Sequence, residues 1–123
     1  MKAPPRILLV DDSPENLEFL ESRLKALGYR TTLVHDGAKA VESVRRDPPD
    51  LVVLDVIMPD VNGYQACREI KKLHKQLPVI ILTCRSDPAD RFWARETGAD
   101  DFLTKPIDPQ VVANRIASLV GQP

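Results

Sequence analysis

Short apolar runs and amphipathic segments alternate along the chain. The first run, residues 6–10, consists of β-prone residues and ends abruptly at Asp11 and Asp12. Runs of this kind, bounded by polar or turn-forming residues, are typical of buried strands. The pattern predicts strands at residues 6–10, 31–35, 51–54, 79–82 and 102–103.

The segments between these runs carry helix signals. After the first run, Ser13 is a candidate N-cap, Pro14 takes the first helical position, and Gly28 ends the segment. Leucines between them form a stripe at helical spacing, at Leu17, Leu20, Leu24 and Leu27. Further helices are predicted at residues 38–46, 63–72, 88–97 and 109–120, the fourth helix being stopped by Gly98.

Alternating strands and helices with short connections predict a doubly wound α/β fold. Each crossover between parallel strands must be right-handed, so the helices cover both faces of a parallel sheet. Ligands of such sheets bind outside the carboxyl ends of the strands. The residues that follow each apolar run are therefore the candidates for chemistry.

Composition narrows the class of protein. A chain of 123 residues with 43% hydrophobic and 28% charged residues suits one globular domain, and we expect flexible ends at residues 1–5 and 121–123. Its net charge of -1 gives no reason to expect direct binding to nucleic acid or to a membrane. Without a long apolar stretch or a signal-peptide pattern, we expect a cytoplasmic protein.

Five polar residues follow the predicted strands. Asp11 and Asp12 follow the first, Asp55 the third, Thr83 the fourth and Lys105 the fifth. Gathered carboxylates repel one another unless a cation neutralises them, and Mg²⁺ is a hard ion that prefers oxygen ligands. Taken singly, the acids fit helix caps or turns and the lysine fits a solvated surface. Their joint placement at one sheet edge favours a magnesium site.

Four separated motifs resemble a bacterial response-regulator receiver domain of the chemotaxis-regulator type. They are LVDDS at residues 9–13, LDVIMPDVNG at 54–63, LT at 82–83 and FLTKP at 102–106, in an order that spans essentially the whole chain. The resemblance implies a flavodoxin-like (βα)5 fold with strand order 2-1-3-4-5. It also implies a phosphoacceptor switch of a two-component phosphorelay, served by a sensor histidine kinase or a phosphotransfer protein.

The same resemblance implies a role for each site residue. Asp55 is the phosphoacceptor, Thr83 donates a hydrogen bond to the phosphoryl group, and Lys105, before a cis proline bond, neutralises charge. The implied Mg²⁺ ligands are Asp12, Asp55 and the Ile57 carbonyl, with Asp11 acting through a metal-bound water. The chain would catalyse its own phosphorylation and dephosphorylation without being an enzyme in the ordinary sense.

The switch and its output surface are less fixed by sequence. Phe102, three residues before Lys105, matches the aromatic position that moves inward on phosphorylation in the family, although core packing is an alternative. The output surface implied is the fourth helix, fifth strand and fifth helix, facing a downstream protein or output domain. Only one of the adjacent Phe92 and Trp93 can face the core squarely. If Phe92 is the buried one, Trp93 is partly exposed and is a candidate anchor for a partner.

Other readings stay open. An aspartyl-phosphate phosphatase of the haloacid dehalogenase type also combines Asp, Thr and Lys, but it requires an Asp-x-Asp pair and a cap domain. A flavodoxin-like electron carrier needs a glycine-rich phosphate loop where Asp11 and Asp12 stand. Packing is the expected role of Cys67 and Cys84, and the side chains of Ile57 and Arg85 leave the phosphoryl lifetime undetermined. A stand-alone regulator and a piece of a larger protein both remain possible.

Overall fold

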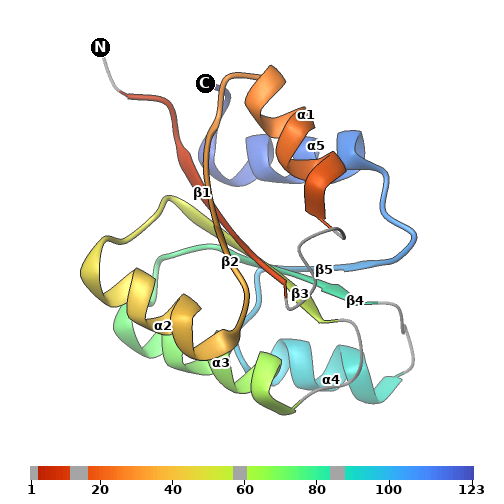
Figure 1. The fold of residues 1–123 in the computed structure, drawn as a ribbon. Helices are drawn as coiled ribbons and strands as arrows, with labels where there is room; N and C mark the ends of the chain where they lie inside the picture. The colour runs from red at the N-terminus through yellow and green to blue at the C-terminus, as the bar shows by residue number, and fades with distance from the viewer. Residues whose placement is uncertain (1–2, 12–16, 57–60, 84–87) are drawn as a thin grey trace.

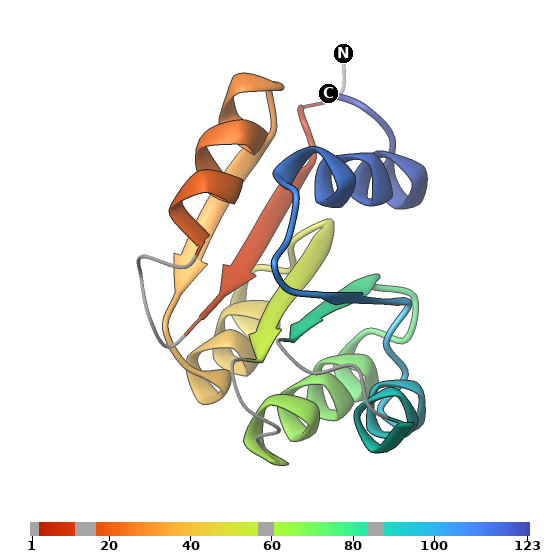
Figure 2. The same cartoon turned by 90° about the vertical axis from the view of Figure 1, so that its right-hand side faces the viewer.

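The computed structural model describes residues 3–11, 17–56, 61–83 and 88–123, and within them five parallel β-strands form one sheet (Figures 1 and 2). The strand order is β2-β1-β3-β4-β5, as the family resemblance implied. β3 is therefore central, and β2 and β5 are the edges. The strands are β1 (Arg6–Val10), β2 (Arg30–Val34), β3 (Leu51–Val56), β4 (Val79–Thr83) and β5 (Asp101–Thr104).

Helices cover both faces of the sheet. In Figure 1, α1 and α5 lie on one side of the strands, and α2, α3 and α4 lie on the other. This is the doubly wound arrangement predicted from the alternation of elements. The helices are α1 (Glu18–Ala26), α2 (Gly37–Arg46), α3 (Val61–Leu73), α4 (Pro88–Glu96) and α5 (Pro109–Val120).

Each face of the sheet has its own apolar core, because side chains alternate along a strand. Leu8 and Val10 of β1 pack on the side of α2, α3 and α4. Ile7 and Leu9 of the same strand pack on the side of α1 and α5. Strands buried on both faces explain why the apolar runs in the sequence are continuous rather than alternating.

Most predicted element boundaries agree with the structure to within two residues. β1 and α5 have the predicted bounds, and Gly28 and Gly98 take positive φ values of 97° and 90° after α1 and α4. The predicted Ser13 cap and Pro14 start of the first helix lie outside the described residues. Leu27 departs from the expected buried stripe: it follows the last helical residue and is 38% exposed.

Candidate functional site

Asp11 and Asp55 end two neighbouring strands at the same edge of the sheet. Val10 of β1 pairs in register with Leu54 of β3, so the next residue of each chain segment is one of these aspartates. Asp11 is fully buried, and so is the side chain of Asp55. Asp11 is held by its backbone N–H, which donates to the Val34 carbonyl at 3.1 Å. The two carboxylates predicted to gather here do lie on adjacent strands.

Lys105 reaches this edge from the turn after β5. Its Nζ lies 2.5 Å from Asp55 Oδ1, and its backbone N–H donates to the Thr83 carbonyl at 2.7 Å. The Lys105–Pro106 peptide bond is cis, as the resemblance implied. The ion pair itself shows that the Lys105 ammonium points toward the aspartate two strands away, so the alternative of a solvated surface lysine is wrong.

Thr83 lies between the two ion-pair partners. It pairs with Val56 on β3 and with Thr104 on β5, so it closes the carboxyl end of β4. The residue is fully buried. Three of the predicted groups, on β3, on β4 and after β5, thus form one contiguous row along the sheet edge.

The charge balance at this edge suits a hard cation. Asp11 and the side chain of Asp55 are buried at neighbouring strand ends, and the Asp55 carboxylate is paired with the ammonium of Lys105. Like charges in a poorly solvated place repel. Carboxylate oxygens are the donors that Mg²⁺ prefers. The other predicted metal ligands, Asp12 and Ile57, lie outside the described residues, and within the described ones no group of three His, Cys, Asp or Glu residues could hold a metal ion.

Phe102 stands on β5, three residues before Lys105. Its ring is partly exposed and packs against the core on the α2, α3 and α4 side. Arg91 of α4 covers the ring, with Cζ 5.2 Å from the ring centroid. Core packing and a contact with α4 are therefore combined at this position.

The surface of α4 differs from the expectation for its two aromatic residues. Phe92 and Trp93 are 52% and 48% exposed, and their rings make an edge contact with centroids 5.4 Å apart. Trp93 is exposed as expected, but the supposed burial of Phe92 is wrong. Asp90 and Ala94, four residues apart, are the buried positions of this helix.

Sequence reasoning missed the role of Asp90. An acidic residue in the first turn of a helix is favoured by the helix dipole alone, so it gave no signal of burial. The Tyr64 hydroxyl of α3 lies 3.4 Å from the Asp90 carbonyl and 3.3 Å from its Oδ1. This polar link joins the first turns of α3 and α4, the helices that follow β3 and β4.

Cys67 is a buried packing residue, as expected. Its Sγ lies 3.5 Å from the Thr97 carbonyl, and burial raises the pKa of the thiol. Cys84 and Arg85 lie outside the described residues. No redox or metal chemistry is indicated for Cys67.

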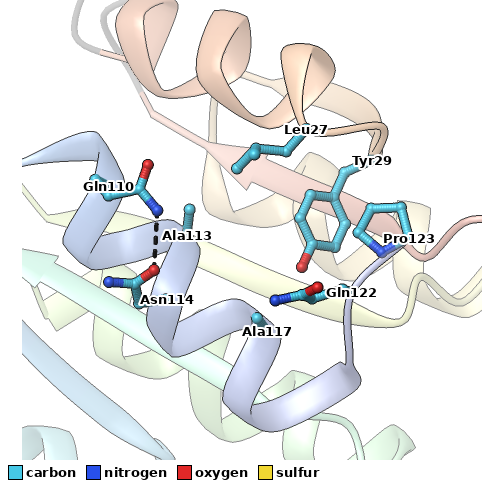
Figure 3. Close-up of a pocket in the computed structure, with 8 residues that line it drawn as sticks. All are labelled: Leu27, Tyr29, Gln110, Ala113, Asn114, Ala117, Gln122 and Pro123. Atoms are coloured by element: carbon cyan, nitrogen blue, oxygen red, sulfur yellow. Dashed lines mark hydrogen bonds between the residues drawn. The ribbon is translucent and has the colours of Figure 1, made fainter.

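A cavity of about 180 Å³ lies near the amino ends of β1 and β2 (Figure 3). The candidate site, with Asp55 and Lys105, lies at the opposite, carboxyl ends of the strands. Tyr29 and the α5 amides Gln110 and Asn114 line it, and the Gln110 amide donates to Asn114 at 2.9 Å. The Tyr29 hydroxyl donates to the Gly121 carbonyl at 2.9 Å. None of the predicted site residues lines this cavity, so it belongs to the packing of α1 against α5.

Comparison with known proteins identifies the family that carries this arrangement. The sequence model of the response regulator receiver domain matches residues 7–117. The chain belongs to the receiver domain family of response regulators. The matched receiver family does not favour the dehalogenase-type phosphatase, and receiver domains take phosphoryl groups from histidine kinases.

Three similar proteins illustrate the range of receiver domains. The chain is 42% identical over 115 residues to the probable transcriptional regulator ycf27 of Cyanophora paradoxa, covering 94% of this chain and 48% of that protein. It is 36% identical to protein PilH of Pseudomonas aeruginosa, covering 94% and 98%. The receiver domain of sensor histidine kinase PA1611 of Pseudomonas aeruginosa PAO1, solved with a magnesium ion in its active site cleft, has 36% identity and a TM-score of 0.86, covering 98% and 100%.

The receiver domain thus spans about half the length of some curated relatives and nearly all of another. Among the described helices, none has the length and apolar character that a membrane crossing requires.

Proposed function

We propose that this receiver domain accepts a phosphoryl group on Asp55 from a sensor histidine kinase or a phosphotransfer protein. The observation that carries the proposal is the 2.5 Å ion pair between Lys105 Nζ and the buried Asp55 carboxylate, at the strand end beside Asp11. A buried acid that pairs with an ammonium, with a second buried acid at the end of the neighbouring strand, is placed for charge-dependent chemistry rather than for packing.

The described side chains suit phosphoryl transfer. An oxygen of the Asp55 carboxylate bonds to phosphorus while the bond from phosphorus to the donor nitrogen breaks, and the imidazole leaves with the bonding electrons. Charge on the phosphoryl oxygens then needs neutralisation and hydrogen bonding. Lys105 supplies the positive charge, and the buried Thr83 hydroxyl, on the strand between Asp55 and Lys105, donates a hydrogen bond.

We infer that Mg²⁺ is held at the same edge by Asp11, Asp12, Asp55 and the Ile57 carbonyl, with Asp11 acting through water. When bound, the ion supplies further charge neutralisation for the phosphoryl oxygens. Two observations support this: the buried carboxylates of Asp11 and Asp55 are an oxygen donor set, and the related PA1611 receiver domain was solved with magnesium in its active site cleft.

We propose that the switch runs from Thr83 through Phe102 to the surface of α4, β5 and α5. Phosphorylation draws Thr83 toward the phosphoryl group, Phe102 repacks into the space released, and α4 shifts. Phe92 and Trp93 are exposed on that surface and suit contact with a downstream protein or an output domain. On this view residues 1–123 form a single receiver domain in the cytoplasm, which needs no direct contact with nucleic acid or a membrane.

Acetyl phosphate with Mg²⁺ tests the acceptor assignment. Intact-mass spectrometry should show one added phosphoryl group on the parent chain and none on Asp55→Asn. Asp47→Asn is the matched control, because the Asp47 side chain is 79% exposed. Equal labelling of parent and Asp55→Asn would exclude Asp55 as the acceptor. Lys105→Met should label more slowly than the parent, and an unchanged rate would exclude the proposed role of its ammonium.

A further inference from the structure

Arg91 and Phe102 make a contact that the family motifs do not include. The Arg91 guanidinium carbon lies 5.2 Å from the centroid of the Phe102 ring, within the range of a cation–π interaction. Within the part of the chain that the structure describes, Arg91 forms no ion pair with a carboxylate. Among the described residues, the Phe102 ring is thus a partner of the exposed Arg91 side chain.

The packing of α4 places Arg91 over that ring. Asp90 and Ala94 face inward, and the Tyr64 hydroxyl contacts Asp90 at 3.3 Å. Fixing these two positions fixes the rotation of the helix about its axis, since residues four apart share one face. Arg91, one position after Asp90, is then directed to the neighbouring strand β5.

Phe102 is well placed to respond to the site. It pairs with Ile81 on β4, two residues before Thr83, and it precedes Lys105 by three residues. Its backbone N–H donates to Asp101 Oδ1 at 2.8 Å, and Asp101 Oδ2 accepts from Arg115 of α5 at 2.5 Å. The backbone is thus held, so the side chain is the part of Phe102 that is left to change position.

We propose that Arg91 is a positioning residue that holds the Phe102 ring in its partly exposed position and so sets the resting state of the switch. The inference rests on the proposed function, because it assumes that phosphorylation moves this ring inward. An exposed cation–π contact shifts a two-state equilibrium by about two- to fivefold. Loss of the Arg91 cation should therefore shift the equilibrium about two- to fivefold toward the state in which the Phe102 ring has moved inward.

The first test uses the unmodified protein and does not depend on phosphorylation. The chain is labelled with 4-fluorophenylalanine, which gives signals from three phenylalanines, and the Phe102 signal is assigned with Phe102→Leu. Arg91→Met, which keeps an apolar stem, should displace the Phe102 ¹⁹F resonance. Arg95→Met, one turn later on the same helix, should leave it in place. An unmoved Phe102 resonance in Arg91→Met would overturn the proposal.

The second test measures the switch by titrating beryllofluoride with Mg²⁺. Arg91→Met should raise the apparent affinity about two- to fivefold over the parent and over Arg95→Met, and the gain should vanish in a Phe102→Leu background. Equal affinities of the parent and Arg91→Met for beryllofluoride would refute the positioning role of Arg91, and so would a gain in affinity that persists without the Phe102 ring. Either result would leave the assignment of Asp55 as the acceptor intact. A parent chain that binds no beryllofluoride would instead refute the proposed function. The ¹⁹F measurement on the unmodified protein would still show whether Arg91 contacts the Phe102 ring.

Discussion

Asp100 joins α3 to β4 at the end of the sheet opposite the candidate site. Its Oδ2 lies 2.7 Å from Lys71 Nζ and accepts from the Val79 backbone N–H at 2.8 Å. Lys71 Nζ also donates to the Leu77 carbonyl at 2.7 Å. Asp100→Ala removes the acceptor that these two groups share. The mostly buried Lys71 ammonium then keeps the Leu77 carbonyl but loses its carboxylate, and the Val79 backbone N–H loses its side-chain acceptor.

The cost of this change follows from two terms. A hydrogen bond to a charged group contributes about 1.5–3 kcal/mol. The side chains of Lys71 and Asp100 are 15% and 35% exposed. A surface ion pair contributes at most about 1 kcal/mol to stability, and breaking a buried pair costs more. We expect the contribution of this ion pair to lie between these two cases. Because Asp100 is about one-third exposed, we expect a total loss of about 2–3 kcal/mol in the free energy of unfolding.

Urea denaturation of Asp100→Ala measures this loss. The matched control is Glu42→Ala, which removes the 3.2 Å ion pair with Arg45 on α2, whose side chains are 54% and 58% exposed. The control should lose less than about 0.5 kcal/mol apart from helix propensity. If Asp100→Ala loses no more than Glu42→Ala, the Asp100 contacts do not stabilise the fold and the reasoning from burial is refuted.

Three further outcomes are expected. Mg²⁺ at several-fold excess over Kd should stabilise the parent by roughly 1 kcal/mol and Asp11→Ala by much less, whereas a parent melting temperature independent of Mg²⁺ would contradict the metal site. Burial raises the pKa of the Cys67 thiol in the folded state above its value in the unfolded state. The protonated thiol therefore contributes stability that is fully present below the unfolded-state pKa. This stability is lost as the pH rises through the folded-state pKa. In Cys84→Ser, the Cys67 thiol should therefore react slowly with Ellman's reagent at pH about 8, and rapid reaction would disprove its native burial. The emission of Trp93, the only tryptophan, should change when beryllofluoride modifies the protein, and constant emission in fully modified protein would exclude the switch surface.

The fold was predictable because local signals and the long-range pattern agree. Continuous apolar runs indicate strands buried on both faces, and alternation with helices then leaves a parallel sheet as the consistent arrangement. β1 and α5 could be located to the residue because both have sharp chemical boundaries. Asp11 ends the apolar run of β1, and Asp108 caps α5 by accepting from the Gln110 N–H at 2.9 Å.

The residues that were misjudged lie where the helical pattern is weak. α4 has charged or aromatic side chains at most positions, so spacing alone did not reveal that Asp90 faces inward and Phe92 outward. Leu27 continues the leucine spacing of α1, but the helix has already ended and the chain turns at Gly28. Hydrophobicity is informative about burial only while the helical geometry persists.

The candidate site could be listed from the sequence but not assembled from it. Strand order decides which carboxyl ends are neighbours, and that order came from the family resemblance rather than from periodicity. The contact between Lys105 and Asp55 crosses β4 and needs the observed turn after β5. The Arg91 contact with Phe102 joins a helix to an edge strand, and no local pattern predicts it. The roles of the site residues stay predictions, including those of Asp12 and Ile57, which lie outside the described residues.

Chemical mapping of the phosphorylated residue tests the central claim most directly. The chain is treated with acetyl phosphate and Mg²⁺, sodium borohydride reduces the aspartyl phosphate to homoserine, and peptide mass spectrometry locates the change. We predict homoserine at the position of Asp55 and unaltered Asp11 and Asp12. Homoserine at either of those two positions, with Asp55 unchanged, would contradict the assignment of Asp55 as the phosphoacceptor.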